Sequence, residues 1–117
     1  DPDRVYLMGS SMGGYATWAM LMSTPELFAA AVPICGGGMA WNAYRMKDIP
    51  IWAFHGVDDG TVTVTESISM ANAVRATGGN IKLTLLPGVN HNAWEPAMYQ
   101  EGAIEWLLTH KRGGNKA

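Results

Sequence analysis

Short apolar runs alternate with stretches of helical spacing along this chain. Four runs are predicted to be strands, at residues 4–8, 29–35, 51–55 and 81–86. Short apolar runs bounded by turn residues are typical of strands that are buried on both faces of a sheet. Strands that alternate with helical segments are typical of βα units. The pattern therefore predicts an α/β fold, with a mainly parallel sheet and flanking helices in the order β-α-β-β-α-β-α.

Individual residues mark the ends of the three expected helices. The first helix follows the glycine-rich turn at residues 9–14. In the second, Thr63 and Glu66 have the spacing of a capping box, and the glycines at 78–79 can end the helix in a left-handed conformation. The last helix is expected to begin near Pro96, since proline is favoured in a first turn. It is predicted to carry three apolar side chains inward: Ile104, Leu107 and Leu108.

Composition limits the classes of protein to which this chain can belong. Its 117 residues, 48% of them hydrophobic and with a net charge of −2, predict one domain over residues 1–112 and a flexible tail at 113–117. The longest apolar stretch, at 27–35, has nine residues, whereas a membrane-spanning helix needs about 20. The mild negative charge argues against nucleic acid as a partner. With Cys35 as the one cysteine, we expect no disulfide, no metal and no other cofactor.

A nucleophile motif lies between the first predicted strand and helix. The sequence GSSMG at residues 9–13 fits G-x-S-x-G. In such a tight turn the central serine, here Ser11, takes a strained conformation that exposes its hydroxyl, and glycines two positions away avoid clashes. The N–H of Met12 would be the first donor to an oxyanion. The alternative is an ordinary glycine-rich turn, and the neighbouring Ser10 lacks the symmetric glycine flanks.

A serine nucleophile needs a base, and three histidines are candidates. His91 lies in a polar loop after the fourth strand, and parallel topology would bring this loop to the same sheet edge as Ser11. His55 ends the third strand and is expected to brace the following turn. His110 lies in the last helical turn, where the helix dipole explains it. We therefore predict that His91 is the base.

The acid that orients the base is expected in the loop after the third strand. Asp58 and Asp59 are adjacent there, and one of them is expected to bond only to its own backbone. Either residue places the acid between Ser11 and His91 in the chain. A nucleophile, acid and base in this order are typical of one serine-hydrolase architecture.

Aromatic residues in two loops are candidates for a substrate pocket. Trp41, Tyr44 and Met46 lie in the predicted loop at 36–48, and Trp94 follows His91. These side chains either form an apolar wall for a substrate or cover the edge of the core. Both interpretations remain open on the sequence alone. Cys35 is expected to be buried and inert.

Three segments together resemble the α/β-hydrolase superfamily of serine esterases. Residues 1–14 resemble the nucleophile strand and turn of its phospholipase/carboxylesterase, polyhydroxybutyrate-depolymerase-like and predicted-peptidase branches. Residues 50–62 are similar to the acid-loop pattern H-G-x-x-D-x-x-V, which favours Asp59 over Asp58; Thr63 stands where proline is usual. Residues 87–94 resemble the loop that carries the catalytic histidine.

The resemblance implies a serine hydrolase that cleaves carboxylic esters with Ser11, Asp59 and His91. A peptidase or acyltransferase with the same residues, or a catalytically silent fragment or binding module, is the alternative. The resemblance further implies that this chain is the C-terminal half of the domain, without the early strands and the second oxyanion donor. Expected partners are a small or polymer-linked ester and either the missing half or a second copy at the open sheet edge. The resemblance makes a secreted or periplasmic location the expectation for this protein.

Overall fold

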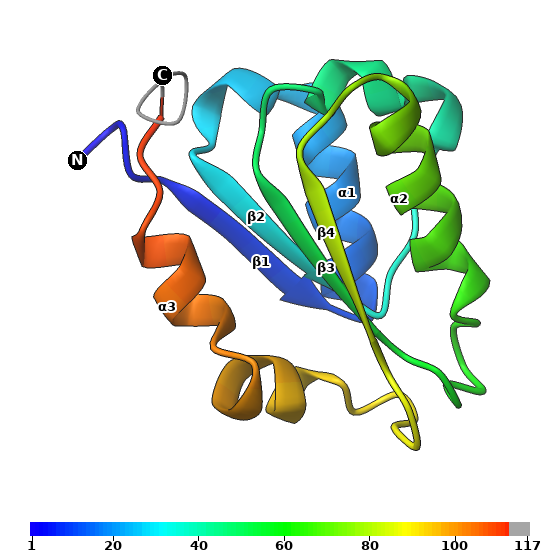
Figure 1. The fold of residues 1–117 in the computed structure, drawn as a ribbon. Helices are drawn as coiled ribbons and strands as arrows, with labels where there is room; N and C mark the ends of the chain where they lie inside the picture. The colour runs from blue at the N-terminus through cyan, green and yellow to red at the C-terminus, as the bar shows by residue number, and fades with distance from the viewer. Residues whose placement is uncertain (113–117) are drawn as a thin grey trace.

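The computed structural model describes residues 1–112, so the predicted tail at 113–117 lies outside the described residues. Four parallel strands form one sheet in the order β1-β2-β3-β4 (Figure 1). The strands are β1 (Tyr6–Ser10), β2 (Ala30–Ile34), β3 (Ile51–Gly56) and β4 (Ile81–Leu86). The predicted α/β class with a parallel sheet is therefore confirmed. The first strand begins and ends two residues later than predicted, so that it reaches Ser10.

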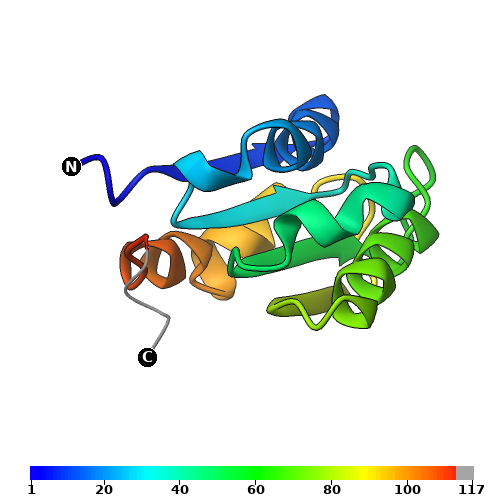
Figure 2. The same cartoon turned by 90° about the horizontal axis from the view of Figure 1, so that it is seen from above.

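Helices cover both faces of the sheet, as Figures 1 and 2 show. One face carries α1 (Met12–Ser23), the 3₁₀ helix η2 (Ala40–Met46) and α2 (Thr65–Ala76). The other face carries the short π-helical turn η3 (Pro96–Gln100) and α3 (Ala103–Leu108). A further 3₁₀ turn, η1 (Pro25–Leu27), joins α1 to β2. The segment at 36–48, predicted as a loop, thus contains the helix η2.

The two central strands separate two apolar clusters. Every residue of β2 and of β3 is buried, which explains why their sequences are almost continuously apolar rather than alternating. Trp18 and Met70 belong to the cluster under α1 and α2. Phe54 and Leu107 belong to the cluster under η3 and α3. Burial of apolar surface on both faces fixes the register of the inner strands, because a shift by one residue would exchange the two faces.

The last predicted helix is divided in two. Of the three side chains that were expected to point inward, two are exposed. Gly102, with φ +77°, separates η3 from α3. Leu107 is 4% exposed, but Ile104 is 39% exposed and Leu108 is 64% exposed. A wide π-helical turn followed by a left-handed residue breaks the spacing of 3.6 residues per turn on which the prediction relied.

The predicted capping box is also absent from α2. The helix begins at Thr65, and no side chain caps it. The hydroxyl of Thr63 lies 2.9 Å from that of Thr65, while the N–H of Glu66 donates to the Thr63 carbonyl oxygen at 3.0 Å. A backbone bond thus replaces the reciprocal side-chain bonds. At the other end Gly78 has φ +83°, the left-handed conformation expected for the end of this helix.

Both outer strands have one open side within the described residues. There β1 pairs only with β2, and β4 pairs only with β3. Every residue of β1 is partly exposed, and the preceding Val5 is 42% exposed. No helix among residues 1–112 is long and apolar enough to cross a membrane. An unpaired strand that carries apolar side chains is a surface at which another chain or segment can add.

We expect the isolated 117-residue chain to self-associate through the edge of β1. Light scattering coupled to gel filtration should give a mass that rises with protein concentration. Val5→Lys should reduce this association, because charged residues on an edge strand oppose pairing. Val57→Lys is the matched control, since Val57 has a similar exposure of 41% but follows β3. A compact monomer at every concentration would contradict the expectation.

Candidate active site

Ser11 lies in the turn between β1 and α1. Its backbone has φ +60°, a value that is costly for a residue with a side chain. Two hydrogen bonds hold the residue there: its N–H donates to the Ile34 carbonyl oxygen, and its own carbonyl accepts from the N–H of Tyr15, each at 3.0 Å. The strain predicted for Ser11 is therefore present, and it is held by the end of β2 and the first turn of α1.

Close backbone contacts explain two of the glycines around Ser11. A Cβ on Gly9 would lie 2.2 Å from the carbonyl oxygen of Gly13, and one on Gly14 would lie 2.4 Å from that of Ile34. A Cβ on Gly13 would meet nothing within 4 Å among the described residues. The expectation that glycine is needed on both sides of the motif thus holds for Gly9 but not for Gly13. The steric requirement instead falls on Gly14, where α1 meets the end of β2.

His91 reaches Ser11 from the loop between β4 and η3. Its Nε2 lies 2.6 Å from the Ser11 hydroxyl oxygen. The loop rests directly on the end of β3, because a Cβ on Gly56 would lie 2.2 Å from the Asn90 carbonyl oxygen. The N–H of Asp58 donates to the Val89 carbonyl oxygen at 3.0 Å, which ties the loop to the turn after β3. Gly56 therefore makes room for the segment that carries His91.

Asp59 completes a chain of hydrogen bonds. Its Oδ2 lies 2.7 Å from His91 Nδ1. Its Oδ1 accepts from the N–H groups of Thr61 and Val62, each at 2.9 Å. Asp59 is 6% exposed, whereas Asp58 is exposed to solvent. Of the two carboxylates, the structure thus brings Asp59 to His91.

These contacts determine the charge on Asp59. Burial raises the pKa of its carboxyl group, but the hydrogen bonds from His91, Val62 and Thr61 outweigh burial, so the pKa lies below its ordinary value. An ionised carboxylate only accepts hydrogen bonds, so His91 Nδ1 is the donor. Its Nε2 is then free to accept the proton of the Ser11 hydroxyl. The contacts select the tautomer that a general base requires.

The other two histidines form their hydrogen bonds with residues other than Ser11. His55 is fully buried, with Nε2 2.7 Å from the Val62 carbonyl oxygen and Nδ1 2.6 Å from the Ser67 hydroxyl oxygen. It braces the turn after β3, as expected. Nδ1 of His110 lies 2.8 Å from the Trp106 carbonyl oxygen at the end of α3. Sequence reasoning did not identify Ser67, since a serine inside a helix carries no distinctive signal.

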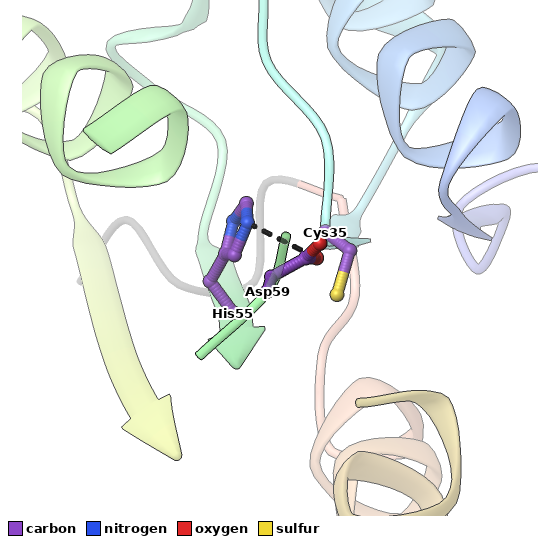
Figure 3. Close-up of side chains that lie close together, drawn as sticks. All are labelled: Cys35, His55 and Asp59. Atoms are coloured by element: carbon purple, nitrogen blue, oxygen red, sulfur yellow. Dashed lines mark ion pairs between the residues drawn. The ribbon is translucent and has the colours of Figure 1, made fainter. Parts of the chain in front are cut away.

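Cys35, His55 and Asp59 form a buried cluster at the carboxyl ends of β2 and β3 (Figure 3). Their potential ligand atoms lie within 4.8 Å of one another. Both ring nitrogens of His55 and both oxygens of Asp59 already have hydrogen-bond partners. Burial raises the pKa of the Cys35 thiol, which favours the neutral form over the thiolate that binds metals. The cluster therefore fits a hydrogen-bonded network better than a metal site.

The helix α1 begins at Met12. The first N–H groups of a helix have no partner within it and point toward its N-terminal end. Met12 is 84% exposed, so this end of α1 lies at the surface. The assignment of its N–H as an oxyanion donor remains a prediction.

The predicted pocket residues separate into two groups. Trp41 and Tyr44 lie in η2, which Figure 1 shows at the opposite end of the sheet from the strands' carboxyl ends. Tyr44 there lines a hollow with Met22, near the C-terminal end of α1. Met46 is fully buried in the core. The sequence left a substrate wall and a cover for the core edge open for these three; the chain after β2 runs along α1 before η2 begins, so they lie far from the carboxyl ends of the strands. Trp94, 38% exposed, remains the candidate close to His91 in the chain.

Two comparisons with known sequences match parts of this chain. The profile of the Prolyl oligopeptidase family matches residues 1–53. Poly(3-hydroxyalkanoate) depolymerase C of Paucimonas lemoignei is 49% identical over 37 residues, which are 32% of this chain and 9% of the depolymerase. The profile match includes the segment that contains Ser11.

Solved structures extend the similarity to nearly the whole chain. A thermostable esterase matches with a TM-score of 0.90 and 43% identity over 96% of this chain. The acylaminoacyl peptidase of Pyrococcus horikoshii matches with a TM-score of 0.73 and 16% identity over 80% of this chain, which shows a shared fold. The present chain spans 32% of the esterase and 20% of the peptidase.

We expect Asp59 to make the stability of the fold depend on pH at the acidic end. Its pKa is lower in the folded chain than the ordinary value of 3.8. Its stabilising contribution is therefore complete above that value and is lost as the pH falls through the folded pKa. Asp59→Asn should lower the free energy of unfolding at about pH 7, and the difference from wild type should shrink at about pH 3. Chemical denaturation measures both, with Asp58→Asn as the matched control. An equal deficit at both pH values would contradict this.

Proposed function

Because the chain belongs to the α/β-hydrolase superfamily, we propose that it carries the nucleophile, acid and base of a serine hydrolase that cleaves carboxylic esters. The observation that carries the proposal is the continuous hydrogen-bonded path from Ser11 through His91 to Asp59. Each residue comes from a different loop, and the lowered pKa of Asp59 favours the ionised carboxylate that the proposed role requires. An accidental cluster of polar residues has no reason to meet all of these conditions.

In the proposed reaction Ser11 attacks the acyl carbon of the ester. His91 Nε2 takes the hydroxyl proton as the new carbon–oxygen bond forms, and Asp59 stabilises the resulting imidazolium. His91 then gives this proton to the oxygen of the departing alcohol as the old ester bond breaks. A water molecule repeats the sequence on the acyl-enzyme, losing a proton to His91 and releasing the carboxylic acid with free Ser11.

The negative oxygen of each tetrahedral intermediate needs donors that are already in place. We assign one of these donors to the N–H of Met12, at the start of α1. One such donor contributes about 2.7–4 kcal/mol to the stability of the transition state. Trp94, which follows the His91 loop, is the proposed contact for the apolar part of the substrate.

Esters are the preferred substrate class for two reasons. An alcohol leaves more readily than an amine, so the simplest use of these three residues is ester cleavage. A relative that is 43% identical over 96% of this chain is described as an esterase, and the matching depolymerase is described as acting on a poly(3-hydroxyalkanoate). A peptidase is the second candidate, because the profile that matches residues 1–53 is that of the Prolyl oligopeptidase family. Acyl transfer and a silent binding module are the remaining alternatives.

The proposal predicts that the intact protein reacts with a fluorophosphonate probe at Ser11 and hydrolyses an aryl ester. Ser11→Ala should abolish labelling, and His91→Ala should slow it strongly, because the hydroxyl then has no base. Ser10→Ala is the matched control, since it removes the adjacent hydroxyl, and it should retain labelling. Mass spectrometry of the labelled peptide identifies the modified residue.

The same assays distinguish the two carboxylates. Asp59→Asn should reduce kcat by about 10⁴-fold, the effect of removing the orienting carboxylate in a serine protease. Asp58→Asn should have far less effect, because its side chain is exposed. Labelling at Ser10, or a folded protein that does not react at all, would contradict the proposed function. A larger loss from Asp58→Asn would contradict the assignment of the acid.

A further inference from the structure

His55 is a polar residue in a position where an apolar one would satisfy packing. It is the fifth residue of β3, every residue of which is buried. An imidazole removed from water is costly unless its nitrogens find partners. Both nitrogens have one, at 2.6 Å and 2.7 Å. The residue is therefore explained by what it binds rather than by the volume that it fills.

The partner on one side is the turn that carries the acid. His55 Nε2 lies 2.7 Å from the Val62 carbonyl oxygen. A carbonyl oxygen only accepts, so Nε2 carries the proton. The N–H of the same Val62 donates to Asp59 Oδ1 at 2.9 Å. Val62 is thus held at its carbonyl by His55 and at its N–H by Asp59, which makes it the link between the two side chains.

The partner on the other side is Ser67 in α2. With the proton on Nε2, His55 Nδ1 accepts from the Ser67 hydroxyl, whose oxygen lies 2.6 Å away. Ser67 is 1% exposed. This bond fixes the rotation and the tautomer of the imidazole, and it anchors the ring to a helix rather than to a loop. The protonated Nε2 also lies 3.5 Å from Asp59 Oδ2, the oxygen that faces His91 (Figure 3).

We propose that His55 is a positioning residue for Asp59, an inference that rests on the proposed hydrolase function. Held by Ser67, its Nε2–H fixes the Val62 peptide, so that the backbone donors keep Oδ1 in place and aim Oδ2 at His91. Loss of this donor leaves the Val62 carbonyl without its imidazole partner. The turn then shifts, and Asp59 no longer holds His91 in register with Ser11. His55 itself touches neither the substrate nor Ser11.

Two substitutions of His55 separate this role from simple filling of the core. The amide N–H of His55→Gln reaches the place of Nε2 and can still donate to Val62. His55→Asn has the same chemistry on a shorter side chain, which reaches only the place of Nδ1. We expect His55→Asn to lower kcat by about 10²-fold, the effect of a misplacement of about 1 Å. We expect His55→Gln, which keeps the donor to Val62 but has no acceptor in the place of Nδ1, to retain more of kcat than His55→Asn, and both variants to keep a nearly unchanged KM for an aryl ester.

Kinetics are compared per active site, counted by titration of Ser11 with a fluorophosphonate, so that unfolded protein does not lower kcat. His110→Gln, at the end of α3, is the matched control and should match the wild type. If His55→Asn does not fold, Ser67→Ala serves instead, and it should lower kcat per site at unchanged KM. Wild-type kcat per site in folded His55→Asn, or in Ser67→Ala, would overturn the positioning role. A wild-type protein without labelling or turnover would instead overturn the proposed function.

Discussion

The hydrogen bond between Asp59 Oδ2 and His91 Nδ1, 2.7 Å long, joins two loops that are separated by α2 and β4. A buried carboxylate is expensive to remove from water, so this bond forms only in a turn that offers other donors. Thr61 and Val62 provide these donors at Oδ1. Hydrogen bonds to charged groups contribute about 1.5–3 kcal/mol each, which explains how the ionised form is retained. The arrangement of Ser11 and His91 depends on this carboxylate.

Parallel pairing of all four strands brings these loops together. Because the strands run in one direction, the turns after β1, β3 and β4 emerge at one edge of the sheet. Close backbone approach then brings the side chains within bonding distance. Gly14 lets the start of α1 meet the end of β2, and Gly56 lets the His91 loop lie on β3. The geometry of the site is thus set by strand direction first and by these two glycines second.

The sequence predicted the strands, their direction and the residues that converge, for physical reasons that can be named. Buried strands leave continuous apolar runs, and G-x-S-x-G marks a turn whose serine has φ +60°. The failures lie where local signals compete with packing. The Thr63 hydroxyl pairs with Thr65 rather than capping α2. Trp41 is carried to the far end of the sheet by a connection that folds into η2.

Other features of the site carry no signal in the sequence at all. The contact of His55 with Ser67 joins β3 to α2 through the core, and neither residue type predicts the other. The steric need for Gly14 rather than Gly13 arises from β2, which follows later in the chain. Distances of this kind depend on tertiary packing, so only the structure reveals them. These distances also show what His55, Ser67 and Gly14 contact, which the sequence did not explain.

The most direct measurement of the central claim is proton NMR of the folded protein with ¹⁵N-labelled histidine. The structure predicts a strongly downfield proton on His91 Nδ1, because it is shared with an ionised, buried carboxylate. This resonance should disappear in Asp59→Asn and persist in Asp58→Asn. A folded wild-type protein without such a resonance, or its persistence in Asp59→Asn, would contradict the account.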